Sequence, residues 1–196
     1  MIKINENDQI NVNENILICS SARSGKTTKI ENFCLNLKNN NKAFIYFTNN
    51  EKICLDLYKN IDILDNENFY LKFKELVLEK KSFLIKLDDN TETNYEKLNL
   101  LSEYIKNYYV CIDELEKFNL FNNEIFSNTK LIATSQSINH VWYNKQINLF
   151  NDFYIGRTVN NSFSDDNINK MLNVLDVNEF YKFDKNEILK ILKTVL

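Results

Sequence analysis

Apolar residues along this 196-residue chain follow two alternating patterns. In the first, short runs of mostly apolar residues stand between polar stretches, which is typical of strands buried on both faces of a sheet. We therefore predict strands at the runs that occupy residues 16–19, 43–48, 61–64, 83–87, 108–112, 131–134 and 152–155.

In the second pattern, apolar residues recur every three or four positions, as on one face of a helix. The helical faces are formed by Ile30, Phe33, Cys34 and Leu37; Ile53, Cys54 and Leu57; Phe69, Phe73, Leu76 and Val77; Tyr95, Leu98, Leu101 and Ile105; Ile168, Met171, Leu172 and Leu175; and Ile188, Ile191, Leu192 and Val195. Asn50 is expected to cap the second of these helices. Strands that alternate with helices predict an α/β fold, with a mainly parallel central sheet and helices on both faces.

The two ends of the chain are predicted to add smaller pieces to this alternation. Residues 1–14 are expected to form a small hairpin, because polar residues alternate with Ile2, Ile4, Ile10 and Val12. Residues 158–196 are predicted to be a C-terminal helical extension of a core formed by 1–157. The length, with no repeat and no Gly/Ser/Pro-rich linker, indicates one domain over 1–196.

Composition narrows the classes of protein. A formal net charge of -3 provides no basic field for nucleic acid, so DNA binding would have to come from a local surface or from assembly. The cysteines show no C-x-x-C spacing and are interpreted as small buried residues of a reducing compartment. The first residues are polar and acidic rather than basic and apolar, and no apolar run approaches the ~20 residues that span a membrane. We therefore expect a cytoplasmic protein with no membrane partner.

The stretch from Asn15 to Thr28, N-I-L-I-C-S-S-A-R-S-G-K-T-T, joins a predicted strand to a predicted helix through a loop of small residues. Strand, loop, G-K-[ST] and helix in this order are the layout of a phosphate-binding P-loop, where backbone N–H groups face the phosphates. Ser20 stands where the usual pattern begins with Gly, which costs energy if φ is positive there. Gly25 is one of only two glycines in the chain, against a usual share of about 7 %.

The motif assigns a role to each of its residues. The nucleotide, ATP, is expected to bind to Ser20, Ser21, Ala22, Arg23, Ser24, Gly25, Lys26, Thr27 and Thr28. Lys26 is the expected catalytic contact to the β- and γ-phosphates, and the Thr27 hydroxyl is an expected ligand of Mg²⁺. The alternative is a chance G-K-T in a lysine-rich chain, which the flanking strand and amphipathic helix argue against.

A second motif is the run Tyr109-Val110-Cys111-Ile112 that ends in Asp113-Glu114. Apolar residues followed by two acids form a Walker B pattern: Asp113 is expected to hold Mg²⁺, and Glu114 to orient and deprotonate an attacking water. The alternative makes the two acids a helix N-cap and first turn. A rival pair, Asp88-Asp89, is disfavoured because Lys86 interrupts the apolar run before it.

Two further features concern polar groups around the γ-phosphate. The strand at 131–134 ends in Ser135-Gln136, and Gln136 is a candidate sensor of the γ-phosphate or the attacking water, with an ordinary strand end as the alternative. The only arginines are Arg23 and Arg157. Arg157 is a candidate finger that acts on a neighbouring subunit, with a surface arginine as the alternative.

Together, S-G-K-T at 24–27, the run into Asp113-Glu114 and the strand that ends in Ser135-Gln136 resemble the FtsK–HerA group of P-loop ATPases. Within that group the chain looks like the small DNA-packaging ATPases of viruses, and the segment L-F-N-D-F-Y-I-G-R at 149–157 is similar to the group's last core strand. The resemblance covers residues 1–157. Ser20 departs from the family pattern, as does the lack of an arginine between Asp113 and Gln136.

The resemblance implies a three-layer RecA-like (ASCE) P-loop NTPase that hydrolyses ATP with Mg²⁺. It implies a ring homo-oligomer, expected to be a hexamer, that moves double-stranded DNA, with capsid or other virion proteins as further partners. Such a protein would work in the host cytoplasm or on the virion. Two alternatives remain open: a small-molecule or nucleotide kinase, and a nucleotide-gated assembly ATPase related to those of filamentous phages. A kinase would need an arginine-bearing lid, which two arginines hardly supply.

Overall fold

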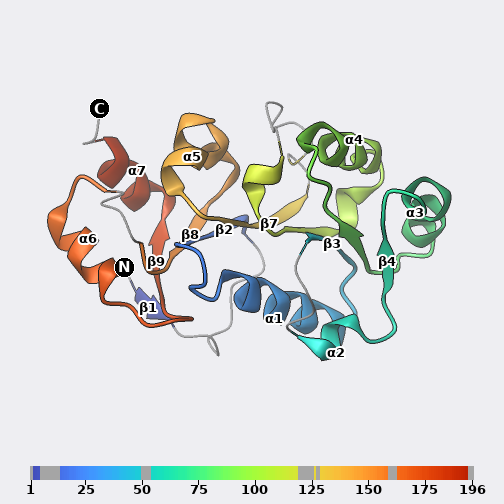
Figure 1. Ribbon diagram of the computed structural model, residues 1–196, viewed down its shortest axis with the longest axis horizontal. Helices are drawn as coiled ribbons and strands as arrows, with labels where there is room; N and C mark the ends of the chain where they lie inside the picture. Colours follow the sequence, from blue (N-terminus) through green and yellow to red (C-terminus); the bar gives the residue numbers. More distant parts are fainter. Residues whose placement is uncertain are drawn as a thin grey trace.

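The central element of the computed structural model is a sheet in which the order of strands differs from their order in the chain (Figure 1). The structure describes residues 2–4, 14–49, 54–118, 126, 129–158 and 163–193. Their strands are β1 (Ile2–Ile4), β2 (Ile16–Cys19), β3 (Phe44–Thr48), β4 (Asp62–Leu64), β5 (Phe83–Lys86), β6 (Tyr109–Ile112), β7 (Lys130–Ser135), β8 (Asp152–Ile155) and β9 (Phe180–Asp184). These form one nine-stranded sheet in the order β1-β9-β8-β2-β7-β6-β3-β5-β4.

Seven neighbouring strands, from β8 to β4, run parallel, and β9 is antiparallel to both β1 and β8. The helices that connect them are α1 (Lys26–Asn39), α2 (Leu55–Tyr58), α3 (Phe69–Leu78), α4 (Thr91–Leu101), α5 (Ile138–Tyr143), α6 (Asp166–Asn173) and α7 (Lys185–Lys193), with short 3-10 turns η1 (Ile105–Asn107), η2 (Leu115–Lys117) and η4 (Gln146–Leu149). In Figure 1, α1 and α2 lie on one side of the sheet, and α4, α5 and α7 lie on the other. The fold is therefore the predicted three-layer α/β architecture.

Strand residues point alternately into two cores, one on each side of the sheet. In β2, Ile16 and Ile18 join the core beneath α1, whereas Leu17 and Cys19 join the larger core on the opposite face. All four residues are essentially inaccessible to solvent. Burial on both faces explains why the central strands are continuous apolar runs rather than alternating ones.

The prediction for the C-terminal segment was partly wrong, because β9 lies between the two helices of the supposed helical extension. The strand brings this segment into the sheet beside β8, with Phe183 paired to Phe153. Phe180 and Phe183 are three residues apart and contribute to opposite cores. In the sequence, a spacing of three is typical of a helical face and not of an alternating strand, which explains why the strand was missed.

The predicted N-terminal hairpin can be compared with the structure only at its first strand. Ile2–Ile4 forms a strand as expected, but its partner is β9, and residues 10 and 12 lie outside the described residues. Asn50 also lies outside them, and the N-cap of α2 is Cys54. Over the described part of the chain, no helix has both the length and the apolar character needed to cross a bilayer.

Candidate nucleotide-binding site

The strand order brings the three sequence motifs together at one edge of the sheet. β7 lies between β2 and β6, and Cys19 of β2 pairs in register with Ser135 of β7. Because parallel strands present their carboxyl ends at the same edge, the residues that follow them converge there. Ser20, Gln136 and Asp113 therefore begin their loops side by side.

The loop from Ser20 to Gly25, which with Lys26, Thr27 and Thr28 is called the P-loop below, turns the chain from β2 into α1. Its positive φ angles are 59° at Arg23 and 89° at Gly25. A Cβ atom at Gly25 would lie 1.7 Å from Asn178 Oδ1, and the Asn178 N–H donates to the Ser24 carbonyl at 3.2 Å. The turn before β9 therefore packs against the P-loop, and both backbone angle and space require glycine at 25.

Ser20 is accommodated without the strain that a positive φ would cause, because it is not among the described residues with that angle. It is fully buried, and its N–H donates to the Ser135 carbonyl at 3.2 Å. The space for its side chain comes from Gly156: a Cβ there would lie 2.9 Å from Ser20 Cβ and 2.9 Å from the Phe180 ring. Both glycines of the chain thus lie at the P-loop.

Lys26 curls back over the loop that precedes it. Its Nζ donates to the carbonyls of Ser20 at 2.7 Å and Ser21 at 2.8 Å, and only 8 % of the residue is exposed. Burial lowers the pKa of Lys26, while the negative partners Asp113, Glu116 and Glu114 oppose that shift. Two backbone carbonyls of the loop therefore hold the amino group in place.

Thr27 and Asp113 are brought together from α1 and the end of β6. The Thr27 hydroxyl donates to Asp113 Oδ2 at 3.1 Å, and the Thr134 hydroxyl donates to Oδ1 at 2.5 Å. Asp113 is 1 % exposed, so its carboxylate is held in one orientation. A hydroxyl and a carboxylate are oxygen ligands of the kind that Mg²⁺ accepts, and the pair fits the predicted metal site.

Glu114 has an unusual backbone conformation, with φ of 63° and ψ of 73°. Its N–H donates to the Thr134 hydroxyl at 2.9 Å, so Thr134 binds both acids of the motif. The side chain is partly exposed beside the buried Asp113. A left-handed conformation at a non-glycine residue costs free energy, and such residues cluster at functional sites.

Gln136 follows β7, where its side chain is exposed and its N–H donates to Glu116 Oε1 at 2.6 Å. Arg157 follows β8 with an exposed side chain, and its carbonyl accepts from the Ser21 N–H at 2.8 Å and the Ser21 hydroxyl at 3.0 Å. Both residues therefore lie at the P-loop edge. In the loop itself, Arg23 and Ala22 are exposed, and the hydroxyls of Ser21 and Ser24 are hydrogen-bonded at 2.9 Å. Thr28 is half-buried in α1.

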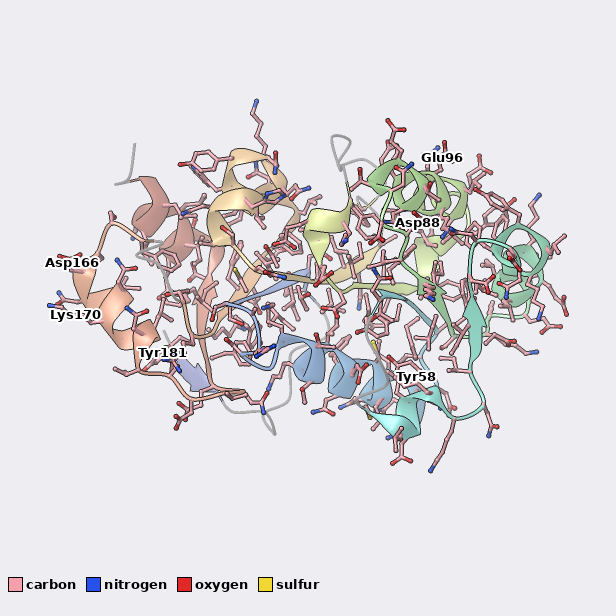
Figure 2. All side chains as sticks on the ribbon, in the orientation of Figure 1. Tyr58, Asp88, Glu96, Asp166, Lys170 and Tyr181 are labelled. Carbon is pink, nitrogen blue, oxygen red and sulfur yellow. The ribbon has the colours of Figure 1, made fainter. Side chains whose placement is uncertain are left out.

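The rival acids Asp88 and Asp89 lie away from this site. They follow β5, which β7, β6 and β3 separate from β2. Asp88 accepts from the Asn90 N–H at 2.8 Å and from the Asn66 amide. In Figure 2, Asp88 lies beneath α4. Its place in the fold is at the start of α4 and not at the P-loop.

Sequence reasoning missed four residues that build the site: Thr134, Gly156, Asn178 and Glu116. Gly156 could have been found, since a chain with two glycines places each where no side chain fits. Thr134 and Glu116 lie within or next to motifs already identified. Asn178 gives no signal in the sequence, because only the turn before β9 brings it to Gly25.

Comparison with known proteins gives structural relatives only. No protein-family model matches the chain, and no curated protein matches its sequence. The fold is similar to the genome-packaging NTPase B204 of Sulfolobus turreted icosahedral virus 2 in complex with AMPPCP, with a TM-score of 0.64, 14 % identity, and 90 % of this chain and 94 % of that chain covered. The complex of the same protein with AMP has a TM-score of 0.62 and 14 % identity, with 90 % of this chain and 95 % of that chain covered. A structure of B204 described as the DNA-packaging ATPase of Sulfolobus turreted icosahedral virus has a TM-score of 0.60 and 15 % identity, with 90 % of this chain and 95 % of that chain covered.

Proposed function

We propose that this protein is an ATP-hydrolysing P-loop motor that translocates double-stranded DNA into a viral particle. The observation that carries the proposal is the convergence of Lys26, Thr27 and Asp113 at the edge where β2, β7 and β6 end. Its fold is similar to that of packaging NTPases with bound nucleotides, which supports this choice among P-loop functions.

ATP would bind with its phosphates against the P-loop and the first turn of α1, because the N–H groups at the start of a helix suit an anion. Lys26 would add its positive charge at the β- and γ-phosphates. Thr27 and Asp113 would hold Mg²⁺, which supplies charge neutralisation to the phosphates. The two protein oxygens lie 3.1 Å apart, which is close enough for both to bind one cation.

Hydrolysis further needs a group that accepts the proton of the attacking water. Glu114 follows the metal-ligand candidate Asp113 and is partly exposed, so its carboxylate is the proposed general base. Gln136 would hydrogen-bond the γ-phosphate or the water from the neighbouring strand end. The two residues come from different strands, β6 and β7, that pair directly.

Arg157 is the proposed source of positive charge on the outer side of the γ-phosphate, in a ring of copies of this chain with double-stranded DNA in its centre. Its carbonyl contact to Ser21 anchors it beside its own P-loop, so action within one subunit is the competing geometry. Arg157→Ala subunits mixed with Lys26→Ala subunits separate the two. Recovered turnover in mixed rings, shown by mass to contain both chains, supports action across subunits, and no recovery contradicts it.

The test of the motor is ATP turnover of the full chain with and without double-stranded DNA, alongside the particle mass. We expect Mg²⁺-dependent phosphate release that DNA stimulates, in a particle several times the 23.3 kDa of one chain. Turnover that DNA does not change would contradict translocation. Transfer of the phosphate to a small acceptor would establish a kinase in its place.

A further inference from the structure

Glu116 is an acid that the proposed machinery does not use, although it links two parts of the site. It lies on η2, the turn that follows Asp113-Glu114. Its Oε1 accepts from the Ser135 hydroxyl at 2.5 Å and from the Gln136 N–H at 2.6 Å. One carboxylate oxygen therefore ties the Walker B loop to the last residues of β7.

The turn that carries Glu116 is itself fixed on both sides. Leu115 is fully buried in the larger core, and the Lys117 carbonyl accepts from Asn94 Nδ2 at 3.1 Å. A side chain on a rigid turn can define the position of the groups that it binds. The chain receives this support at the Gln136 N–H, in the same residue whose side chain would contact the γ-phosphate.

The other carboxylate oxygen, Oε2, is buried and has no hydrogen-bond partner. This has a practical consequence for mutagenesis, because an amide nitrogen in its place would break no existing bond. Glutamine at 116 would keep Oε1 as the acceptor for Ser135 and Gln136 while removing the charge. The carboxylate also lies close enough to Lys26 to oppose the lowering of the lysine pKa by burial.

We propose that Glu116 is a positioning residue of the hydrolytic site, which fixes the end of β7 so that Gln136 is held toward the phosphates. The inference rests on the proposed ATP hydrolysis and adds a residue outside the D-E pair of the Walker B motif. Glu116 acts through hydrogen bonds accepted by one oxygen, and its negative charge is not required. A second general base at this position would instead need the charge.

The experiment compares Glu116→Ala, Glu116→Gln and Gln136→Ala in the full chain, with Glu96→Ala on the exposed side of α4 as the control (Figure 2). Steady-state ATP turnover gives kcat and KM, and thermal unfolding checks the fold. We expect Glu116→Ala to lower kcat roughly 10- to 100-fold with little change in KM, because misplaced groups cost rate rather than binding. Glu116→Gln should stay within about threefold of the parent, since a neutral acceptor makes the same bonds at about half the strength.

The double variant Glu116→Ala/Gln136→Ala shows whether Glu116 acts through Gln136. We expect its kcat to equal that of Gln136→Ala, because a positioning residue has no effect once its target is gone. Three results would each overturn the inference: parent-like kcat in Glu116→Ala, equal losses in Glu116→Gln and Glu116→Ala, or multiplied losses in the double variant. Lack of ATP turnover by the parent would instead contradict the proposed function.

Discussion

Two clusters at the carboxyl edge of the same sheet combine a buried lysine with an aspartate after a strand. In the first, Lys26 and Asp113 lie around the P-loop, at the ends of β2 and β6. In the second, Lys97 and Asp88 lie at the end of β5. Burial lowers the pKa of both lysines, so residue type and burial do not distinguish the two clusters.

The two clusters differ in the groups that interact with the first N–H groups of the adjoining helix, α4 or α1. The N-cap of α4 is Asn90, whose side chain accepts from the Glu92 N–H at 2.9 Å, and Glu92 adds a negative charge in the first turn. The N-cap of α1 is Gly25, with no side-chain cap and no acid in the first turn. Since the first N–H groups of a helix attract an anion, α4 supplies its own, and we propose that the phosphates of ATP take the corresponding place at α1.

The polar groups of the second cluster are also used internally. Lys97 Nζ donates to the Lys86 carbonyl at 3.3 Å and to Asn66, and Asn94 binds both the N–H and the carbonyl of Asp88 at 2.7 and 2.8 Å. Hydrogen bonds from the Asn90 N–H and the Asn66 amide hold the pKa of Asp88 below its usual value. The lining of the adjoining cavity of about 550 Å³ includes the acids Asp65, Glu67, Asp88 and Asp89 against one lysine, Lys86, and this negative excess would repel a phosphate. We infer that this cluster is structural.

The largest expected contrast is between the two lysines. Lys26→Ala should abolish ATP turnover while the fold is kept, because it removes the point charge at the β- and γ-phosphates. Lys97→Met, which exchanges a buried charge for an apolar side chain of similar length, should leave turnover within about twofold. Phosphate release and thermal unfolding of the two variants measure the contrast. A well-folded Lys26→Ala protein with normal turnover would remove the basis of the P-loop assignment.

The acidic residues of the two clusters should show the next largest difference in ATP turnover. Glu114→Gln keeps shape and hydrogen bonding but loses the base, so turnover should fall by about 10²-fold or more while ATP still binds. Asp113→Asn should raise the Mg²⁺ concentration needed for half-maximal turnover. Asp88→Asn and Asp89→Asn are the matched controls, and we expect both to be parent-like in a Mg²⁺ titration. If the Asp88→Asn and Asp89→Asn proteins lost turnover and the Asp113 and Glu114 variants did not, the Walker B acids would be Asp88 and Asp89.

A smaller effect is expected at Gly156, beside the P-loop. Gly156→Ala places a methyl group 2.9 Å from Ser20 Cβ and the Phe180 ring, so β8, β9 or the loop must shift. Overpacking of this kind costs about 1–3 kcal/mol of unfolding free energy. Because Ser20 begins the P-loop, KM for ATP should rise as well. Urea unfolding and ATP titration measure the two changes, with exposed Asn151→Ala as the control; an unaltered KM would show that the loop tolerates the shift.

Much of the fold followed from the sequence, since strands buried on both faces must be apolar runs and β2, β3, β5, β6, β7 and β8 are such runs. The pairing of β1 with β9 could not be predicted, because it joins residues about 180 positions apart and depends on a strand with mixed faces. For the site, Lys26, Thr27 and Asp113, which the motifs singled out, lie together at one edge of the sheet, and their roles stay predictions. Asn178 makes its contact only after folding, so no local pattern identifies it. Glu116 lies next to a motif, but its contact with the end of β7 is made only in the folded chain.

Apart from the control variants, the smallest expected effect on turnover comes from Asn94, which connects the two clusters. Its amide binds the Asp88 backbone and the Lys117 carbonyl, next to Glu116, and the residue is fully buried. Asn94→Ala removes the partner of these partly buried backbone groups, which costs about 1–3 kcal/mol for each group that water does not reach. Turnover of the folded protein should change less than about threefold, because Leu115 packing still holds η2. Urea unfolding and kcat below the unfolding range measure both quantities. A loss of kcat above tenfold with unchanged stability would show that the structural cluster positions the hydrolytic one through η2, and the separation between the two regions would no longer hold.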